Sequence, residues 1–160
     1  RFFQDCDREV NARLLEWMIS RRGQESWFVT LTFKSFVTTV WAQKHRDRWL
    51  ARLRASLVDS GGGRLKWVCA TEWQVRDDVR YHLIVSAWGL HSQSRKSWEE
   101  RWKANGGGFS RIYDAVLKAA PYLAKYLNKR LGGELQMGGS WLGLTVPASV
   151  SCSCQGPETV

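Results

Sequence analysis

Two strand-like segments joined by a short polar turn constrain the fold of this chain more than any other feature. Residues 65–74 and 79–88 are rich in β-branched and aromatic residues, and Arg76, Asp77 and Asp78 lie between them. A crossover between parallel strands needs about a dozen residues or more, whereas a tight turn is enough for antiparallel strands. The sequence therefore predicts a β-hairpin here, with an antiparallel sheet around it.

The hydrophobic periodicity of the rest of the chain predicts four helices and three more strands. The helices are expected at 8–22, 38–58, 94–105 and 115–130, and the strands at 27–33, 109–113 and 141–146. This order predicts one α+β domain over residues 1–146, in which helices flank a central antiparallel sheet of about five strands. Residues 147–160 are Ser-rich, and we expect a disordered tail there.

The charge balance favours a polyanionic partner. The chain has 24 Lys and Arg against 15 Asp and Glu, a formal net charge of +9, which attracts nucleic acid or an anionic membrane surface. Charges interrupt every apolar segment, so the sequence predicts neither a membrane span nor a secretory signal. Ten Trp are many for this length, and Trp with Arg suits stacking on bases. The four Cys match neither a zinc site nor a secreted disulfide framework, which predicts reduced thiols in a cytoplasmic protein.

Two tyrosines and two lysines recur at helical spacing in the predicted helix 115–130. Tyr122 and Tyr126 lie four residues apart and therefore share a face, as do Lys125 and Lys129 about 100° away. A phenol can act as a nucleophile, and nearby cations favour the phenolate and bind phosphate. Half-buried packing of the two rings is the more frequent role of such a pair, and this spacing alone does not decide between them.

The predicted hairpin carries a second polar group. Glu72 and Gln74 share one face of the first strand, and Arg80 and His82 share one face of the second. Pairing across the turn would bring all four onto one patch of the sheet. A carboxylate and an imidazole suit Mn²⁺, Mg²⁺ or Zn²⁺. Two alternatives stay open: His82 as a hydrogen-bonded strand residue, and Glu72 as the partner of Arg80 in a structural ion pair.

Other polar and aromatic residues are expected to play structural roles. The helix at 94–105 is expected to be exposed, with charges between its two tryptophans. His45 is expected in the core or an interface, His91 in a loop, Tyr113 in strand packing, and Arg46, Arg48, Arg52 and Arg54 on a solvated helix face that can track DNA phosphates.

Three motifs in the same order resemble those of the HUH endonuclease superfamily, in particular the two-tyrosine initiators of rolling-circle replication. Residues 28–33, Phe-Val-Thr-Leu-Thr-Phe, resemble the first-strand motif. Residues 72–82 resemble the metal motif, and residues 122–129, Tyr-Leu-Ala-Lys-Tyr-Leu-Asn-Lys, resemble the tyrosine motif. One departure is that Arg80 stands where the family carries its first metal-binding His, and an arginine, always protonated, cannot ligate a cation.

The resemblance implies an HUH, ferredoxin-like palm that cleaves and rejoins single-stranded DNA at an origin or element end through a 5′-phosphotyrosine. It implies Tyr122, Tyr126 and Lys125 as catalytic residues, His82 and Glu72 as ligands of Mn²⁺ or Mg²⁺, and Arg80, Lys129 and Gln74 as DNA-binding residues. It also implies a helicase and host replication proteins as partners.

Three other functions stay open. Because Arg80 breaks the metal motif, the chain is alternatively a DNA-binding module of the same fold whose cleavage is weakened or lost. A transposase or relaxase of the same superfamily is another alternative. An RNA-binding domain on a similar sheet is compatible with the basic charge and the aromatic residues, but it leaves the paired tyrosines unexplained.

Overall fold

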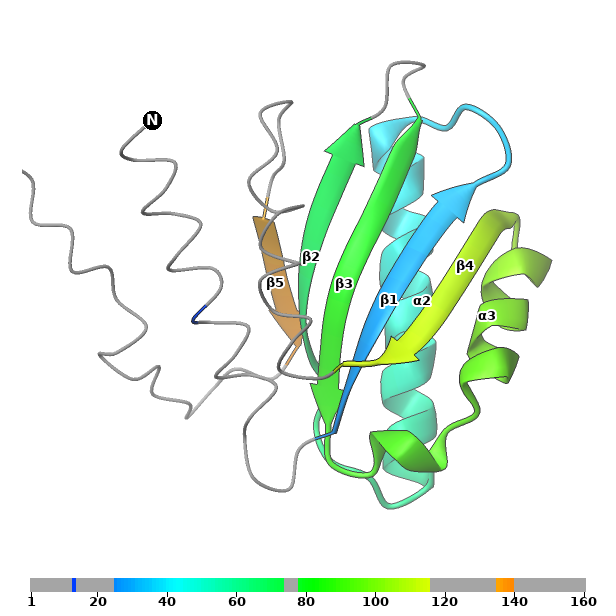
Figure 1. The fold of residues 1–160 in the computed structure, drawn as a ribbon. Helices are drawn as coiled ribbons and strands as arrows, with labels where there is room; N and C mark the ends of the chain where they lie inside the picture. The colour runs from blue at the N-terminus through cyan, green and yellow to red at the C-terminus, as the bar shows by residue number, and fades with distance from the viewer. Residues whose placement is uncertain (1–12, 14–24, 74–77, 116–134, 140–160) are drawn as a thin grey trace, which may run out of the picture.

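The computed structural model of this chain describes residues 13, 25–73, 78–115 and 135–139. All but one residue of each predicted helix at 8–22 and 115–130 lies outside these ranges, as do the predicted strand 141–146 and the tail 147–160. In chain order (Figure 1), the elements are β1 (Glu25–Phe33), α2 (Thr39–Asp59), β2 (Lys66–Trp73), β3 (Val79–Ala87), the 3₁₀ helix η1 (Leu90–Ser92), α3 (Arg95–Ala104), β4 (Gly107–Asp114) and β5 (Leu135–Gly139).

The strands form one antiparallel sheet in the order β4-β1-β3-β2-β5. The predicted hairpin is the pair β2–β3, in which Glu72 lies opposite Arg80 and Ala70 opposite His82. β3 also pairs with β1, which places Thr30 opposite His82 on its other side. These findings confirm the α+β class and the antiparallel sheet of five strands.

The two helices cover one face of the sheet, with α2 lying across the strands and α3 beside β4 (Figure 1). Alternate residues of β1 and β3 face α2 and are fully buried against it, because a strand turns every second side chain to the same face. Removing this apolar surface from water is the main force that holds the two layers together. The core contains Trp27, Val29, Leu31, Leu50, Leu53, Leu57, Tyr81, Leu83 and Val85.

α3 is a helix as predicted, but its apolar side is not exposed. Trp98 and Trp102 are 2% and 0% exposed, because their spacing of four places both rings on the side that packs into the core. Their indole N–H groups donate to Gln93 Oε1 and to the Thr32 carbonyl, so neither polar group is lost on burial. The expected exposure holds only for the charged side of the helix.

Capping residues set the helix ends. Thr38 Oγ1 accepts from Trp41 N at 3.2 Å at the start of α2, and Ser94 Oγ accepts from Ser97 N at 3.2 Å at the start of α3. The glycine run after α3 ends the helix as expected, with Gly106 at a φ of 94°. Gly107, however, already belongs to β4, and a Cβ there would lie 2.3 Å from the Trp102 indole nitrogen.

Two other predictions about side chains are wrong. Arg46 is 4% exposed and not on a solvated face, because it lies on the side of α2 that faces the sheet. Its guanidinium lies 5.0 Å from the ring centres of both Trp67 and Tyr81. Tyr113 lies in β4 as expected, but its side chain is 55% exposed and does not pack into the core.

β5 was not expected at Leu135–Gly139. It adds an edge strand next to β2, with Met137 opposite Val68 and Gly138 opposite Trp67. None of the helices in the described ranges is long and apolar enough to span a membrane.

Candidate functional site

Polar residues from three neighbouring strands meet on the sheet face that is turned away from α2. The strand register places Thr30 of β1 beside His82 of β3, and Glu72 of β2 opposite Arg80 of β3. Because Arg80 and His82 are two residues apart, both side chains belong to this face. The prediction that Glu72, Arg80 and His82 share one patch of the sheet is therefore confirmed.

His82 is held by contacts on three sides. Its Nε2 lies 2.8 Å from Glu72 Oε2, and its Nδ1 lies 3.3 Å from Thr30 Oγ1. The Phe28 ring stacks on the imidazole with an interplanar angle of 13°. An ionised carboxylate can only accept a hydrogen bond, so Nε2 carries the proton, and in the neutral ring the Thr30 hydroxyl donates to Nδ1.

Burial strengthens the pair formed by Glu72 and His82. The His82 side chain is 7% exposed and that of Glu72 is 14% exposed, so little water competes for their hydrogen bond. The alternative of a hydrogen-bonded strand histidine describes this arrangement. The alternative of an ion pair between Glu72 and Arg80 does not, because no such pair is present among the described residues.

The donor set at this pair suits a divalent cation only in part. Imidazole nitrogen and carboxylate oxygen are ligand types that Mn²⁺ accepts, and Mg²⁺ uses few protein ligands and keeps several waters. Within the described ranges, no group of three His, Cys, Asp or Glu residues is placed to hold a metal ion. Glu72 and His82 thus offer two donors, with the Arg80 cation on the neighbouring position of the same face.

A polar hollow of about 370 Å³ opens beside His82 at the end of the sheet where β3 begins. Thr30 contributes to both, since it lines the hollow and hydrogen-bonds to His82. Arg80, which is exposed, supplies a cation to the same hollow. The remaining lining residues are Thr32, Phe33, Asp78, Val79 and Phe109.

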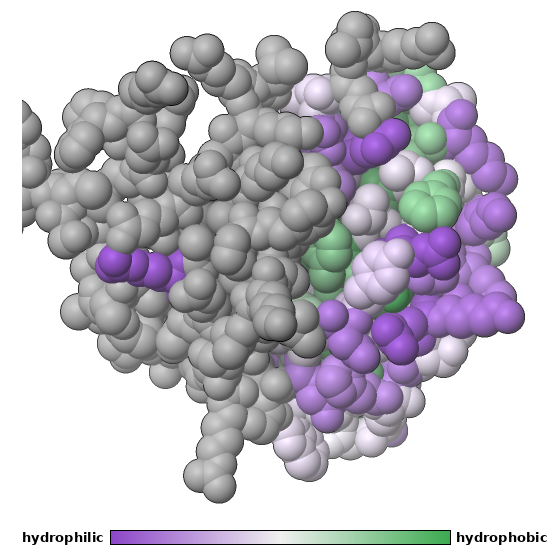
Figure 2. Space-filling view, viewed as in Figure 1, coloured by the Kyte–Doolittle hydropathy of each residue, from purple (hydrophilic) through white to green (hydrophobic). Residues whose placement is uncertain are grey.

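Phe109 gives this hollow an aromatic wall. Its side chain is 59% exposed, and the Arg111 guanidinium lies 5.3 Å from its ring centre. Thr32 Oγ1 donates to the Phe109 carbonyl at 2.6 Å and so fixes the strand position of the ring. Figure 2 shows this side of the molecule, where hydrophilic side chains cover much of the described surface. An exposed aromatic ring beside two arginines can stack on a base and bind a phosphate.

Sequence reasoning did not single out the roles of Thr30 and Phe109. The alternation Thr30-Leu31-Thr32 was a usable signal, because two hydroxyls at a spacing of two must share a strand face. Phe109 gave no such signal, since a strand phenylalanine is most often buried. Its exposure depends on the position of β4 at the edge of the sheet.

The other predicted site residues lie outside the described residues. These are Tyr122, Lys125, Tyr126, Lys129 and Gln74, and their roles stay predictions.

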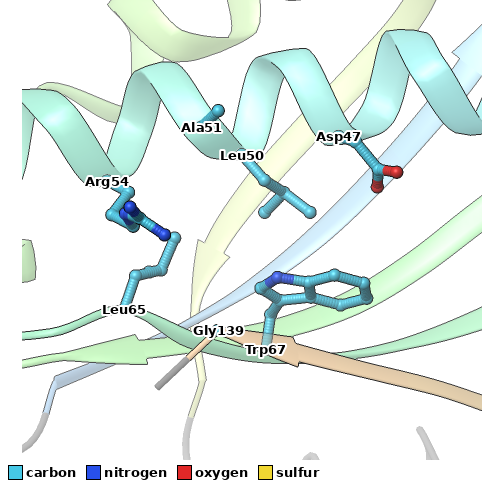
Figure 3. A pocket seen from close by; sticks show the side chains of 7 residues that line it. All are labelled: Asp47, Leu50, Ala51, Arg54, Leu65, Trp67 and Gly139. Carbon is cyan, nitrogen blue, oxygen red and sulfur yellow. The ribbon is translucent and has the colours of Figure 1, made fainter.

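A second hollow of about 190 Å³ lies between α2 and β2 (Figure 3). Leu50 and Ala51 line it from the helix, and Leu65 and Trp67 line it from the sheet side. This lining is mostly apolar, and the hollow is on the opposite face of the sheet from His82. It therefore forms no part of the Glu72–His82 site.

Comparison with protein families gives one match. The family described as replication-associated protein ORF2 matches residues 26–131, which is more than half of the chain. The match includes β1, the β2–β3 hairpin with Glu72 and His82, and the segment from Tyr122 to Lys129. No curated protein and no solved structure matches the chain.

Proposed function

The chain belongs to the replication-associated protein ORF2 family, and from this premise we propose that it initiates replication by nicking and rejoining single-stranded DNA. The observation that carries this proposal is the Glu72–His82 pair beside the Arg80 hollow, all within the segment that the family matches. A buried acid–imidazole pair next to an exposed arginine and an aromatic ring suits a phosphodiester substrate with unpaired bases.

The proposed nucleophile is Tyr122. Its phenolate oxygen attacks the scissile phosphorus, the bond from phosphorus to the 3′ oxygen breaks, and that oxygen leaves as a 3′-hydroxyl after taking up a proton. The protein stays joined to the 5′ phosphate. Attack by Tyr126, or by a 3′-hydroxyl, would then transfer or reseal the strand, and Lys125 would support the phosphate charge. The spacing of these residues and their position in the matched segment support these roles.

The hollow beside His82 is the proposed binding site for the DNA next to the cleaved bond. Arg80 would bind a backbone phosphate, and Phe109 would stack on a base. The Thr30 and Thr32 hydroxyls line the same space and can hydrogen-bond to phosphate or sugar oxygens. Unpaired DNA fits this role, because a duplex would keep its bases away from Phe109.

Glu72 and His82 are the residues that would hold Mn²⁺ or Mg²⁺. When bound, such a cation withdraws charge from the phosphate and makes it a better target for attack. Thr30 and Phe28 keep the His82 ring in place, so the two donors are already oriented. Arg80 supplies a fixed positive charge on the same face and can carry part of the same electrostatic role.

The second candidate function is a DNA-binding module of this fold with weakened or absent cleavage. Arg80 is the observation that favours it, because it replaces an imidazole ligand with a cation. The two candidates predict the same DNA affinity and differ in covalent chemistry. A test must therefore measure bond cleavage and not binding alone.

The test is covalent attachment to a pool of labelled single-stranded oligonucleotides of random sequence, with and without Mn²⁺. We expect an adduct that survives denaturing electrophoresis, that decreases strongly in Tyr122→Phe, and that disappears in the double variant with Tyr126→Phe. Tyr113→Phe is the matched control, because it removes an exposed phenol from β4. An adduct that persists in the double variant would refute the nucleophile assignment, and no adduct from the parent chain would favour the binding module.

A further inference from the structure

Three arginines converge between α2 and α3, on the side of the molecule opposite the Glu72–His82 pair. Arg48 and Arg52 come from α2 and Arg101 from α3, and they line a small cavity together with His45. We call these four residues the arginine notch. No carboxylate lines this cavity, so its charge is positive throughout.

The guanidinium groups of the notch lack acidic partners. None of the ion pairs among the described residues involves Arg48, Arg52 or Arg101. Arg48 and Arg52 are four residues apart on one helix, where like charges repel each other. Arg101 is held in place by stacking on the Trp98 ring, at 4.4 Å from its centre. An anion between these groups would replace repulsion with attraction.

His45 adds an independent sign of a missing ligand. Its side chain is 6% exposed, and its Nε2 is a buried polar atom with no hydrogen-bond partner among the described residues. The ring stacks on Trp41 at 4.9 Å and lies 4.4 Å from the Trp102 ring. A buried polar atom without a partner in a native fold calls for a water or an ion that completes it.

The size of the cavity limits what the notch can hold. Its free space is about 10 Å³, which is about that of one water molecule or one phosphate oxygen. The arginines surround this space at its outer side, where guanidinium groups can bind the remaining phosphate oxygens in pairs. A single phosphodiester group on a longer strand therefore fits better than a small molecule that must enter whole.

We propose that the arginine notch binds one backbone phosphate of DNA, so that the protein contacts DNA on its helical side as well as at the sheet. His45 Nε2 would then act as a hydrogen-bond donor to the phosphate oxygen that enters the cavity. This contact needs no base and no reactive group, so it positions DNA and does not read its sequence. It does not depend on the tyrosine chemistry, and the adduct assay above does not test it.

The test compares two double variants that remove the same charge. Arg48→Gln with Arg52→Gln empties the notch, whereas Arg54→Gln with Arg64→Gln removes two exposed arginines elsewhere. The affinity for a fluorescent single strand and for the same sequence as a duplex is measured over a range of salt concentrations. We expect the notch variant to lose one phosphate contact, so that the slope of log K against log salt falls by about 0.7 for the single strand or about 0.9 for the duplex.

The control variant should keep the parent slope. Equal slopes in the parent and notch variants, or equal losses in both double variants, would overturn the proposal, because a general loss of charge would then explain the data. Both double variants change exposed residues, and equal melting temperatures would confirm that they fold.

A second measurement locates the contact. Addition of DNA should shift the NMR signals of the His45 ring in the parent chain and not in the notch variant. Inorganic phosphate serves as the probe for a free anion. A His45 shift with inorganic phosphate but none with DNA would contradict a role in DNA binding, and no shift with either ligand would remove the site.

Discussion

Glu72 Oε2 lies 2.8 Å from His82 Nε2, so the two proposed metal ligands are hydrogen-bonded to each other across the β2–β3 hairpin. A cation that enters between them must take the place of the shared proton. Thr30 holds the opposite ring nitrogen, so the imidazole can exchange the proton for a metal without leaving its position. The nearest resident charge that opposes this exchange is Arg80, which pairs with Glu72 in the strand register.

Arg80→His should therefore raise the affinity for Mn²⁺. The change removes a like charge from the same strand face and adds an imidazole two residues from His82. At a partly desolvated site, one like charge within several Å costs on the order of a few kcal/mol, so we expect a gain of roughly tenfold or more. Calorimetric titration with Mn²⁺ measures it, and single-turnover nicking should increase in parallel.

Two variants control this experiment. Arg111→His makes the same change on β4, where Arg111 lies in register with Thr30, and it should alter Mn²⁺ affinity less. Glu72→Gln should abolish the gain when it is combined with Arg80→His, because a carboxylate ligand is lost. If Arg80→His binds Mn²⁺ no better than the parent chain, Arg80 does not occupy a ligand position.

Phe109→Ala should weaken binding to single-stranded DNA and leave duplex binding nearly unchanged. Stacking of one base on an aromatic side chain is worth about 1–3 kcal/mol, which is a loss of roughly 5- to 150-fold. Trp88→Ala is the matched control, since Trp88 is also 59% exposed but follows β3 at the opposite end of the sheet. Fluorescence anisotropy with a labelled oligonucleotide is the measurement, and equal losses in both variants would exclude a specific stacking role for Phe109.

Arg46→Ala should destabilise the fold strongly. The buried guanidinium donates to Asp47 and to Gln136 Oε1, and it lies between the Trp67 and Tyr81 rings. Loss of a charged hydrogen bond and two cation–π contacts predicts a decrease of about 3 kcal/mol in the free energy of unfolding. Chemical denaturation measures this change. Arg54→Ala on the same helix should change it by less than about 0.5 kcal/mol, because Arg54 is exposed.

The sequence was sufficient to predict the arrangement of the hairpin. Side chains alternate along a strand, so Glu72, Arg80 and His82 had to share a face once the two segments paired. It was also sufficient for α2, since Thr38 matches the preferred residue type at a helix start. Local rules of this kind apply before any tertiary contact is known.

The burial of Arg46 was missed although the sequence contained a signal for it. Arg46 lies four residues after Ala42 and three before Trp49, on the apolar stripe that the helix was expected to bury. The neighbouring arginines suggested a solvated face instead. Helical spacing was the better guide, because an arginine can be buried between aromatic rings when its hydrogen bonds are made.

β5 and the arginine notch could not be predicted from local patterns. β5 contains two glycines and no β-branched residue, and it is a strand only because β2 offers it an edge. A Cβ at Gly138 would lie 2.2 Å from Trp67 Cζ2, so that position needs glycine for a close approach that only the fold reveals. The notch likewise requires that α3 place Arg101 beside two arginines of α2.

Stability should decline at alkaline pH because two buried acids share the core beneath Arg46. Burial raises the pKa of the Cys69 thiol to about 12 and that of the Tyr81 phenol to about 12, and Arg46 opposes both shifts only in part. The unfolded chain ionises these groups near their ordinary pKa values of 9.0 and 10.0. Between those values and about pH 12, the folded state holds more protons than the unfolded state, so its stability decreases as pH rises.

Urea denaturation at pH 8, 9, 10 and 11 tests this expectation. The free energy of unfolding should change little from these two groups below pH 9, and then fall by about 1.4 kcal/mol per pH unit for each group that titrates. Cys69→Ala and Tyr81→Phe should each make the decline shallower relative to their own values at pH 8. Tyr113→Phe, which removes a phenol that is 55% exposed, should leave the slope of the parent chain in place. A slope that neither core variant changes would show that Cys69 and Tyr81 are not the groups that couple stability to pH.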